Sequence, residues 1–391
     1  MTPYFASILA KLQQKGIENI VVVPNNHQEK AVGAGVKAVD HTTACKIVFE
    51  SVSNAYYGKQ KYDHVIEILS REQPDIVVFI WPYLLQLFFE RSIIRYIKSK
   101  GIKLVLKEIP FQIPPYGQMS YFKNYPVYDE NMNLLSDSVG FNLRNVFMMY
   151  IRKYLYTRID GSLNYRSDAK DILLSYGIDK QRIHVTYNSS DTEALLSTLE
   201  KIQSTPALLP QKLRVIHIGR LVKWKRVDLL INAFSIVVSN MDKVELLIVG
   251  DGPELESLKQ QVQLLNLASS VRFAGGVYDT YTLGKYMYES SIYVLAGMGG
   301  LSINDAMTYG LPIICSVCDG TEKDLVREYQ NGFFFKEGDV ADLADKITFL
   351  LNNQALREQF GKKSQQIITE EINVNSVSDR YFKAFVDIVN N

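Results

Sequence analysis

The chain has 391 residues, of which 47% are hydrophobic and 22% charged, and its formal net charge is +1. This length predicts two domains, each with its own core, and the near-neutral charge argues against a general nucleic-acid binder. No apolar run reaches the roughly 18 residues that span a bilayer. The N-terminus lacks the pattern of a signal peptide, and three cysteines give no disulfide framework, so we expect a cytoplasmic protein.

The first half of the chain alternates helical patterns with short apolar runs. We expect helices over residues 4–14, 63–71 and 84–99, and strands at 20–23, 46–50, 75–80, 103–107 and 183–187. Residues 111–147 are rich in proline and tyrosine and then polar, which indicates a long irregular excursion. Residues 189–211, with Pro206 and Pro210, are the best candidate for a linker between domains.

Residues 141–156 mix aromatic residues and methionines with Arg144, Arg152 and Lys153. We interpret them as a core helix with a cationic outer face. The same composition suits a helix that lies at a membrane surface, so this alternative stays open.

The second half alternates more regularly. Apolar runs at 213–218, 244–249, 271–274, 292–295, 312–315 and 332–335 predict strands, with helical stripes at 229–237 and 255–265 and a final helix at 374–389. Strands that alternate with helices predict an α/β fold with a doubly wound parallel sheet. Such sheets bind ligands beyond the carboxyl ends of their strands.

The expected strand at 292–295 leads into a glycine-rich turn that contains Gly297, Gly299 and Gly300. Glycines allow a backbone to approach a ligand closely, and a helix that starts near Ser302 would direct free N–H groups at a phosphate or diphosphate. Asp305, one turn further on, could accept hydrogen bonds from sugar hydroxyls. Alternatively, Ser302 and Asp305 only cap the helix after a tight turn.

A second group follows the strand at 213–218, where Arg220 comes directly after Gly219 and Lys225 precedes the next helix. Both cations are expected at the carboxyl edge of the sheet, where an arginine and a lysine can neutralise a diphosphate leaving group. The alternative is a solvated basic loop. The sequence also contains a lone Cys-x-x-C pair, Cys315 and Cys318, for which a metal or redox role is disfavoured because no further ligands stand at zinc spacing.

The order of these motifs with Val249-Gly-Asp-Gly-Pro253, Phe273-Ala-Gly275 and Asn331-Gly-Phe-Phe334 resembles the retaining GT-B nucleotide-sugar glycosyltransferases of the group 1, family 4-like type. The resemblance is close over residues 213–352 and weaker over 159–191. It implies two Rossmann-like, doubly wound domains facing a cleft. The expected division is an acceptor-binding domain at 1–200, a nucleotide-sugar domain at 201–372 and a segment at 373–391 that packs back onto the first domain.

The resemblance also implies roles for individual residues. Arg220 and Lys225 match the cations that hold the donor diphosphate and stabilise its departure, and Asp305 matches the second acidic residue of the Glu-x7-Glu motif, which binds the donor ribose. The backbone that contacts the diphosphate and sugar matches Gly219, Gly297, Met298, Gly299, Gly300, Leu301 and Ser302. The segment that lines the nucleobase matches Gly276, Val277 and Tyr278. Such enzymes generally need no metal, so we expect neither a metal nor another cofactor.

Two features depart from the family pattern. Gly297 stands where the first acidic residue of Glu-x7-Glu is expected. The family's first strand and its Gly-Gly turn have no counterpart before Tyr4, so either the domain is built differently or the start is truncated.

For the acceptor side, the sequence offers Trp81 and Glu108 at expected strand ends, with core packing and an exposed carboxylate as the respective alternatives. The resulting hypothesis is a hexosyltransferase that transfers a sugar, with retention, from a nucleotide-diphosphate sugar such as a UDP-sugar to a hydroxyl of a glycan or lipid-linked acceptor. Synthesis of bacterial lipopolysaccharide or capsule, with peripheral contact at the inner membrane face, fits by analogy. The alternatives are a non-catalytic paralogue that stabilises an active partner and a sugar-nucleotide epimerase of the same fold. The sequence does not identify the base, the sugar or the acceptor.

Overall fold

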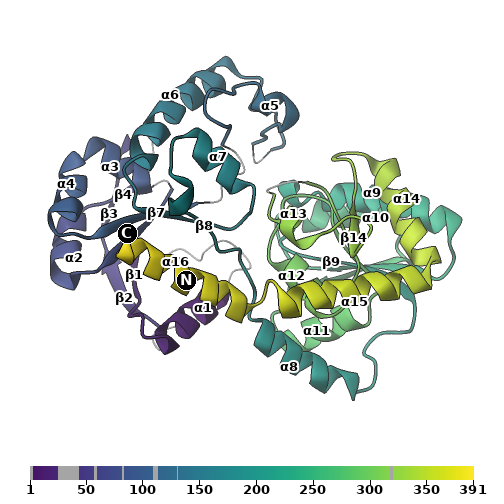
Figure 1. Ribbon diagram of the computed structural model, residues 1–391. Coiled ribbons are helices and arrows are strands. Elements are labelled where there is room, and N and C mark those ends of the chain that lie inside the picture. Colours follow the sequence, from purple (N-terminus) through teal and green to yellow (C-terminus); the bar gives the residue numbers. More distant parts are fainter. Residues whose placement is uncertain are drawn as a thin grey trace. The chain divides into compact units, whose positions relative to one another are not determined.

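The computed structural model describes residues 3–24, 44–56, 60–81, 83–108, 113–129, 131–317 and 320–391 (Figure 1). These residues form an α/β chain of two compact units. Within the described ranges, the first unit comprises residues up to Tyr187 together with Asn375–Asn391, and the second comprises Asn188–Val374.

The second unit contains one six-stranded parallel sheet in the order β11-β10-β9-β12-β13-β14. Its strands are β9 (Leu213–Ile218), β10 (Val244–Val249), β11 (Val271–Gly275), β12 (Ile292–Leu295), β13 (Ile313–Cys315) and β14 (Gly332–Phe334). Every residue of β10 and β12 is buried, which explains why these strands read as continuous apolar runs.

Helices cover both faces of this sheet (Figure 1). They are α8 (Thr192–Gln203), α9 (Val227–Asn240), α10 (Leu255–Leu264), α11 (Thr280–Tyr288), α12 (Ser302–Thr308), α13 (Glu322–Leu325), α14 (Val340–Asn352) and α15 (Gln354–Glu370). Apolar residues of α9, α10 and α14 form one core cluster with side chains of β9, β10 and β12, while α12 packs against α8 and α15.

Helix α8 corrects the interpretation of residues 189–211 as a linker. The Asp191 carboxylate caps the helix by accepting a hydrogen bond from the Ala194 N–H (3.1 Å), and Leu199 and Ile202 are buried. The helix packs on α11 and α12 of the second unit. The domain boundary expected between residues 200 and 201 therefore falls inside a helix, because the two prolines that suggested a linker lie beyond its end.

The described residues of the first unit form three separate sheets. Two parallel strands, β1 (Ile20–Pro24) and β2 (Lys46–Glu50), form one, and β5 (Ile76–Ile80), β6 (Lys103–Glu108), β7 (Gly161–Asn164) and β8 (Ile183–Val185) form a parallel sheet in that order. The third is an antiparallel pair, β3 (Val52–Asn54) and β4 (Gln60–Tyr62), which the sequence analysis did not anticipate.

The helices of the first unit are α1 (Pro3–Gln14), α2 (Val65–Glu72), α3 (Gln86–Phe89), α4 (Arg91–Ser99), α5 (Tyr121–Asn124), α6 (Val139–Tyr156), α7 (Ala169–Ser175) and α16 (Val374–Asn390). Single helical turns stand at η3 (Tyr83–Leu85) and η5 (Lys180–Arg182). The helix expected over 84–99 is broken at Glu90, whose backbone is not helical (φ −106°, ψ 68°). The C-terminal helix α16 packs on α1 through an edge contact between Tyr381 and Phe5 (Figure 1).

Helix α6 departs from the expected pattern of a core helix with a cationic outer face. Its inner face buries Met149, Ile151 and Leu155, but its exposed face is largely apolar. The exposed apolar residues recur at helical spacing: Val139 (74% exposed), Leu143 (66%), Phe147 (44%) and Tyr150 (58%). Among the described residues, no helix is long and apolar enough to cross a bilayer.

Candidate active site

The turn after β12 and the segment after β9 are held together in the second unit by Lys225. This lysine lies in the short 3-10 helix η6 (Lys223–Lys225), and its ammonium group donates hydrogen bonds to the carbonyls of Met298 (2.8 Å) and Gly299 (2.5 Å). In the reverse direction, the Met298 N–H donates to the carbonyl of Trp224 (2.8 Å). Two of the predicted site segments, far apart in the sequence, therefore form one structure at the carboxyl edge of the sheet.

Arg220 comes from the same connection between β9 and α9. Its guanidinium group lies 5.8 Å from the centre of the Trp224 ring, and its Nε is buried without a hydrogen-bond partner among the described residues. A buried guanidinium N–H that lacks an acceptor is costly, so this atom is suited to an anionic ligand.

Gly297 has no room for a side chain. A Cβ built there would lie 2.2 Å from the carbonyl oxygen of Trp224 and 2.6 Å from the carbonyl carbon of Lys225. Both are backbone atoms that cannot rotate away. The space beside Gly297, where the resemblance led us to expect an acidic residue, is thus filled by the backbone of η6.

The predicted helix after the glycine turn is present but short, and Ser302 does not cap it. Leu301 occupies the N-cap position without a side-chain hydrogen bond, and the Ser302 hydroxyl instead accepts a hydrogen bond from Tyr293 (2.6 Å). The capping interpretation of Ser302 and Asp305 is therefore wrong, because the Tyr293 hydroxyl reaches Ser302 from the neighbouring strand β12.

Asp305 is held by a hydrogen bond from Ser190, while its Oδ1 is buried and has no partner in the described part of the chain. Burial raises the pKa of this carboxyl to about 6, because the charged form loses hydration, and the Ser190 hydrogen bond opposes the rise only in part. A carboxylate oxygen in this state can accept a hydroxyl hydrogen bond from a ligand.

The segment expected to line the nucleobase follows β11. The Tyr278 ring lies 3.2 Å from a Cβ built on Gly276, and Tyr278 is 51% exposed. At the neighbouring strand end, a Cβ on Gly250 would lie 1.9 Å from the carbonyl oxygen of Gly219. The glycines of Val249-Gly-Asp-Gly-Pro253 are thus needed for close packing against the segment that carries Arg220.

The predicted acceptor residues belong to the first unit, where Arg152 joins them. The Arg152 guanidinium lies over the Trp81 ring at 4.3 Å and 3.8 Å from the Glu108 carboxylate, which also accepts a hydrogen bond from the Tyr156 hydroxyl. Burial raises the pKa of Glu108, and the arginine opposes this effect. Glu108 is therefore a buried, paired carboxylate, so the interpretation as an exposed strand-end group is wrong.

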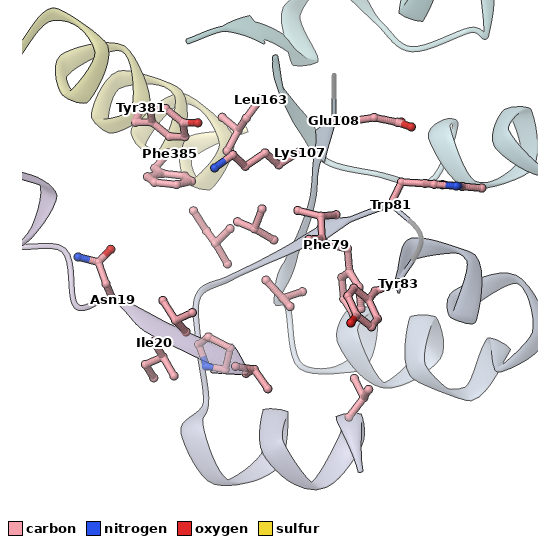
Figure 2. A pocket seen from close by; sticks show the side chains of 18 of the residues that line it. Asn19, Ile20, Phe79, Trp81, Tyr83, Lys107, Glu108, Leu163, Tyr381 and Phe385 are labelled. Atoms are coloured by element: carbon pink, nitrogen blue, oxygen red, sulfur yellow. The ribbon is translucent and has the colours of Figure 1, made fainter. Parts of the chain in front are cut away.

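Trp81, Glu108 and Arg152 all line a cavity of about 1400 Å³ in the first unit. Figure 2 shows that Glu108 and Trp81 lie together, while Lys107 points the opposite way, toward Tyr381 and Phe385. The sequence analysis did not place Arg152 or Tyr156 at this site, because their approach to Glu108 across 44 to 48 positions depends on how α6 packs. Their helical spacing of four residues was the available signal.

In the described ranges, no group of three or more histidine, cysteine, aspartate or glutamate side chains could hold a metal ion. Cys315 is buried in β13, and Cys318 lies outside the described residues.

Comparison with known protein families gives a match to most of the second unit. Residues 199–367 match the family described as glycosyl transferases group 1. The second unit belongs to this family. Among curated relatives, the poly(ribitol-phosphate) alpha-N-acetylglucosaminyltransferase of Staphylococcus aureus is 28% identical over 212 residues, which cover 53% of this chain and 42% of the relative. The lipopolysaccharide core biosynthesis glycosyltransferase LpsE of Rhizobium meliloti is 24% identical over 207 residues, covering 52% of this chain and 58% of LpsE. The chain thus spans about half of the length of these two group 1 relatives.

Solved structures extend the similarity to both units. Anabaena HepE in complex with UDP aligns with a TM-score of 0.66 at 16% identity, over 98% of this chain and 96% of HepE. At this identity the similarity shows the fold, which is GT-B, as the sequence analysis predicted.

Proposed function

We propose that this chain is a metal-independent glycosyltransferase that moves a sugar from a nucleotide-diphosphate sugar to an acceptor hydroxyl with retention of configuration. The observation that carries the proposal is the contact of Lys225 with the glycine turn after β12, together with the buried, unpartnered Nε of Arg220 in the same connection between β9 and α9. Family membership of the second unit supports it independently.

In this reaction the bond between the anomeric carbon and the diphosphate oxygen breaks, the acceptor oxygen forms the new bond to that carbon, and the proton of the acceptor hydroxyl passes to the departing diphosphate. Negative charge develops on the departing diphosphate. The Arg220 guanidinium and the Lys225 ammonium group supply fixed positive charge at that point, in the role that a metal ion serves elsewhere. The packing of η6 on the glycine turn keeps the lysine in place, so little reorganisation is needed.

Asp305 and Tyr278 are assigned to the nucleoside. The unpartnered Oδ1 of Asp305 accepts a hydrogen bond from a ribose hydroxyl, and the exposed Tyr278 ring offers a face to the base. UDP is the first nucleotide to test, because HepE was crystallised with UDP.

The acceptor is assigned to the first unit. Trp81 and the Arg152–Glu108 pair line its cavity, and an aromatic ring beside a charged pair is suited to a glycan. A lipid-linked acceptor is supported by α6, whose exposed apolar residues Leu143, Phe147 and Tyr150 are flanked by Arg144 and Lys153. Such a face can lie in the headgroup region of an anionic membrane, which gives a peripheral contact. Bacterial surface polysaccharide synthesis fits this acceptor class and the relatives' printed activities.

The test uses the purified chain with UDP, GDP, ADP and dTDP and with their sugars. Specific binding raises the melting temperature, and donor turnover is followed as nucleoside diphosphate release. Arg220→Ala is expected to lower turnover by about 10²–10³-fold, the usual cost of losing one group that stabilises developing charge. Lys223→Ala is the matched control, because it removes an exposed cation from the same segment. Equal losses in both variants would contradict the assignment, and turnover that stops with EDTA would refute metal independence.

A second candidate is a non-catalytic paralogue that retains the fold. The observation that favours it is Gly297, where the packing of η6 leaves no space for the expected carboxylate. It predicts neither turnover nor nucleotide binding in the same panel. Conversion of a nucleotide sugar without any acceptor would instead identify an epimerase.

A further inference from the structure

One end of the cavity in the first unit has a cationic wall. Helix α6 lines the cavity with Arg144 and Arg152, among other residues, and the Arg152 guanidinium lies over the Trp81 ring at 4.3 Å. Trp81 directly follows β5, so Arg152 stands at the carboxyl end of that strand, where Figure 2 shows Trp81 beside Glu108. Arg144 lies two turns earlier in α6, about 12 Å along the helix axis, and is exposed.

Negative charge is sparse at this end of the cavity. Among the described residues that line it, three of the four carboxylates precede β1 or β5 in the chain and so belong near the amino ends of those strands: Glu18, Glu72 and Asp75. The fourth, Glu108, is beside Arg152, and the Tyr156 hydroxyl already donates a hydrogen bond to it. Two arginines therefore face one partnered carboxylate.

The Arg152 guanidinium keeps one edge for a further acceptor. Its Nε is buried and has no hydrogen-bond partner in the described part of the chain. Nη2, which shares an edge of the guanidinium plane with Nε, lies 3.8 Å from the Glu108 carboxylate, and this distance is too long for a hydrogen bond. A buried N–H without an acceptor is costly, and the Nε–Nη2 edge is the one that binds an oxyanion through two parallel hydrogen bonds.

We propose that the acceptor carries an oxyanion, either a phosphate ester or a carboxylate, next to the sugar that receives the transfer, and that Arg152 holds this oxyanion. The inference rests on the proposed function and specifies the acceptor class. Two oxygens of the anion accept hydrogen bonds from Nε and Nη2, and the neighbouring sugar lies against the Trp81 ring. The exposed Arg144 attracts the anion toward the cavity, because it adds positive charge where the cavity meets solvent.

The test measures binding through the fluorescence of Trp81. The sequence has two tryptophans, Trp81 and Trp224, so Trp224→Phe leaves Trp81 as the reporter. Nε is shielded from solvent in the free chain, so the ligand and the indole ring beside the guanidinium must adjust to each other, which changes the emission. The full chain is titrated at constant ionic strength with the 1-phosphates, uronic acids and methyl glycosides of common hexoses, and with inorganic phosphate.

The sugar phosphates or the uronic acids should bind at least about tenfold more tightly than the neutral glycosides, the usual gain from hydrogen bonds to a charged group. A response to only one of the two identifies the anion as phosphate or carboxylate. Inorganic phosphate should bind more weakly than the sugar phosphates, because it has no ring to contact Trp81.

Variants of α6 separate a bidentate site from general attraction. Arg152→Lys keeps the charge but loses the planar fork, and it should weaken anion binding by about tenfold or more. Lys153→Met is the matched control, because it removes the neighbouring cation, which is exposed and is not among the lining residues, and binding should not change. The double variant Arg152→Met with Glu108→Gln leaves no buried unpaired charge, so it should remain folded and bind charged and neutral sugars equally weakly.

Three results would overturn the proposal: neutral glycosides that bind as tightly as the charged sugars, equal losses in Arg152→Lys and Lys153→Met, or no change of Trp81 emission with any probe. These titrations contain no donor, so they do not depend on transferase activity. Anion binding in a chain that turns over no donor would contradict the proposed function alone. Transfer to neutral acceptors that is unchanged in Arg152→Lys would contradict the oxyanion site alone.

Discussion

Replacing Gly297 by alanine tests whether the glycine turn and η6 form one rigid structure. The new Cβ would lie 2.2 Å from the Trp224 carbonyl oxygen and 2.6 Å from the Lys225 carbonyl carbon. Non-bonded atoms cannot approach so closely, so either the turn or η6 must move. The hydrogen bond from the Met298 N–H to the Trp224 carbonyl (2.8 Å) is then strained or lost.

The expected magnitude follows from overpacking against backbone, which costs about 1–3 kcal/mol and occasionally more. For a unit of this size, each kcal/mol corresponds to about 2–4 °C, so we expect the melting temperature to fall by about 2–12 °C. Donor binding should fall as well, because Lys225 is displaced from the turn. Calorimetry and nucleotide titration measure the two effects.

Gly300→Ala is the control from the same turn. A Cβ there would lie 3.4 Å from the Lys225 Nζ and 3.9 Å from the Ser302 Oγ, which are ordinary van der Waals distances, so we expect a small change. The reasoning is refuted if Gly297→Ala retains the wild-type melting temperature, or if Gly297→Glu, which introduces a carboxylate at this position, raises turnover.

Three further predictions concern buried charged groups. Asp305→Asn should stabilise the protein at pH 7 by about 1–3 kcal/mol. Burial raises the pKa of this carboxyl to about 6 in the folded state, so the wild-type protein loses stability as the pH rises from about 4 to 6. Urea unfolding across this pH range should show the loss in the wild type but not in the variant. Arg152→Met should cost about 3–5 kcal/mol, because Glu108 keeps a buried charge without its cation, and adding Glu108→Gln should recover part of that stability in a double-mutant cycle. Burial lowers the pKa of Lys107 to about 7, so between about pH 7 and 10 the unfolded chain binds one proton more than the folded chain, and the free energy of unfolding rises with pH. Lys107→Met should flatten this rise, as measured by denaturant titrations at several pH values. An unchanged dependence of the unfolding free energy on pH would contradict the assignment.

The elements of the fold could be predicted from the sequence where their residues are completely buried. Strands β9, β10 and β12 have the bounds that their apolar runs predicted, because both faces of a parallel sheet are covered. The short β3 and β4 were missed because their residues are mostly polar and half-exposed. Helix α8 was missed because two prolines beyond its end outweighed its own Asp191 cap.

The candidate site could be predicted only in part, and the reason is different. Arg220 and Lys225 were predicted because each stands at a strand end, and strand ends of a parallel sheet share one edge. That η6 fills the space beside Gly297 could not be predicted, since it depends on a backbone contact across more than seventy residues. The same holds for Arg152, whose position over Trp81 is set by the packing of α6.

The contact between α16 and the first unit has a consequence for synthesis. A Cβ on Gly161 of β7 would lie 2.4 Å from the side chain of Ile388, so this glycine lets the last helix of the chain lie directly against that strand. A ribosome therefore finishes every residue of the second unit before the helix that completes the first unit emerges. The half that is translated first is therefore completed last.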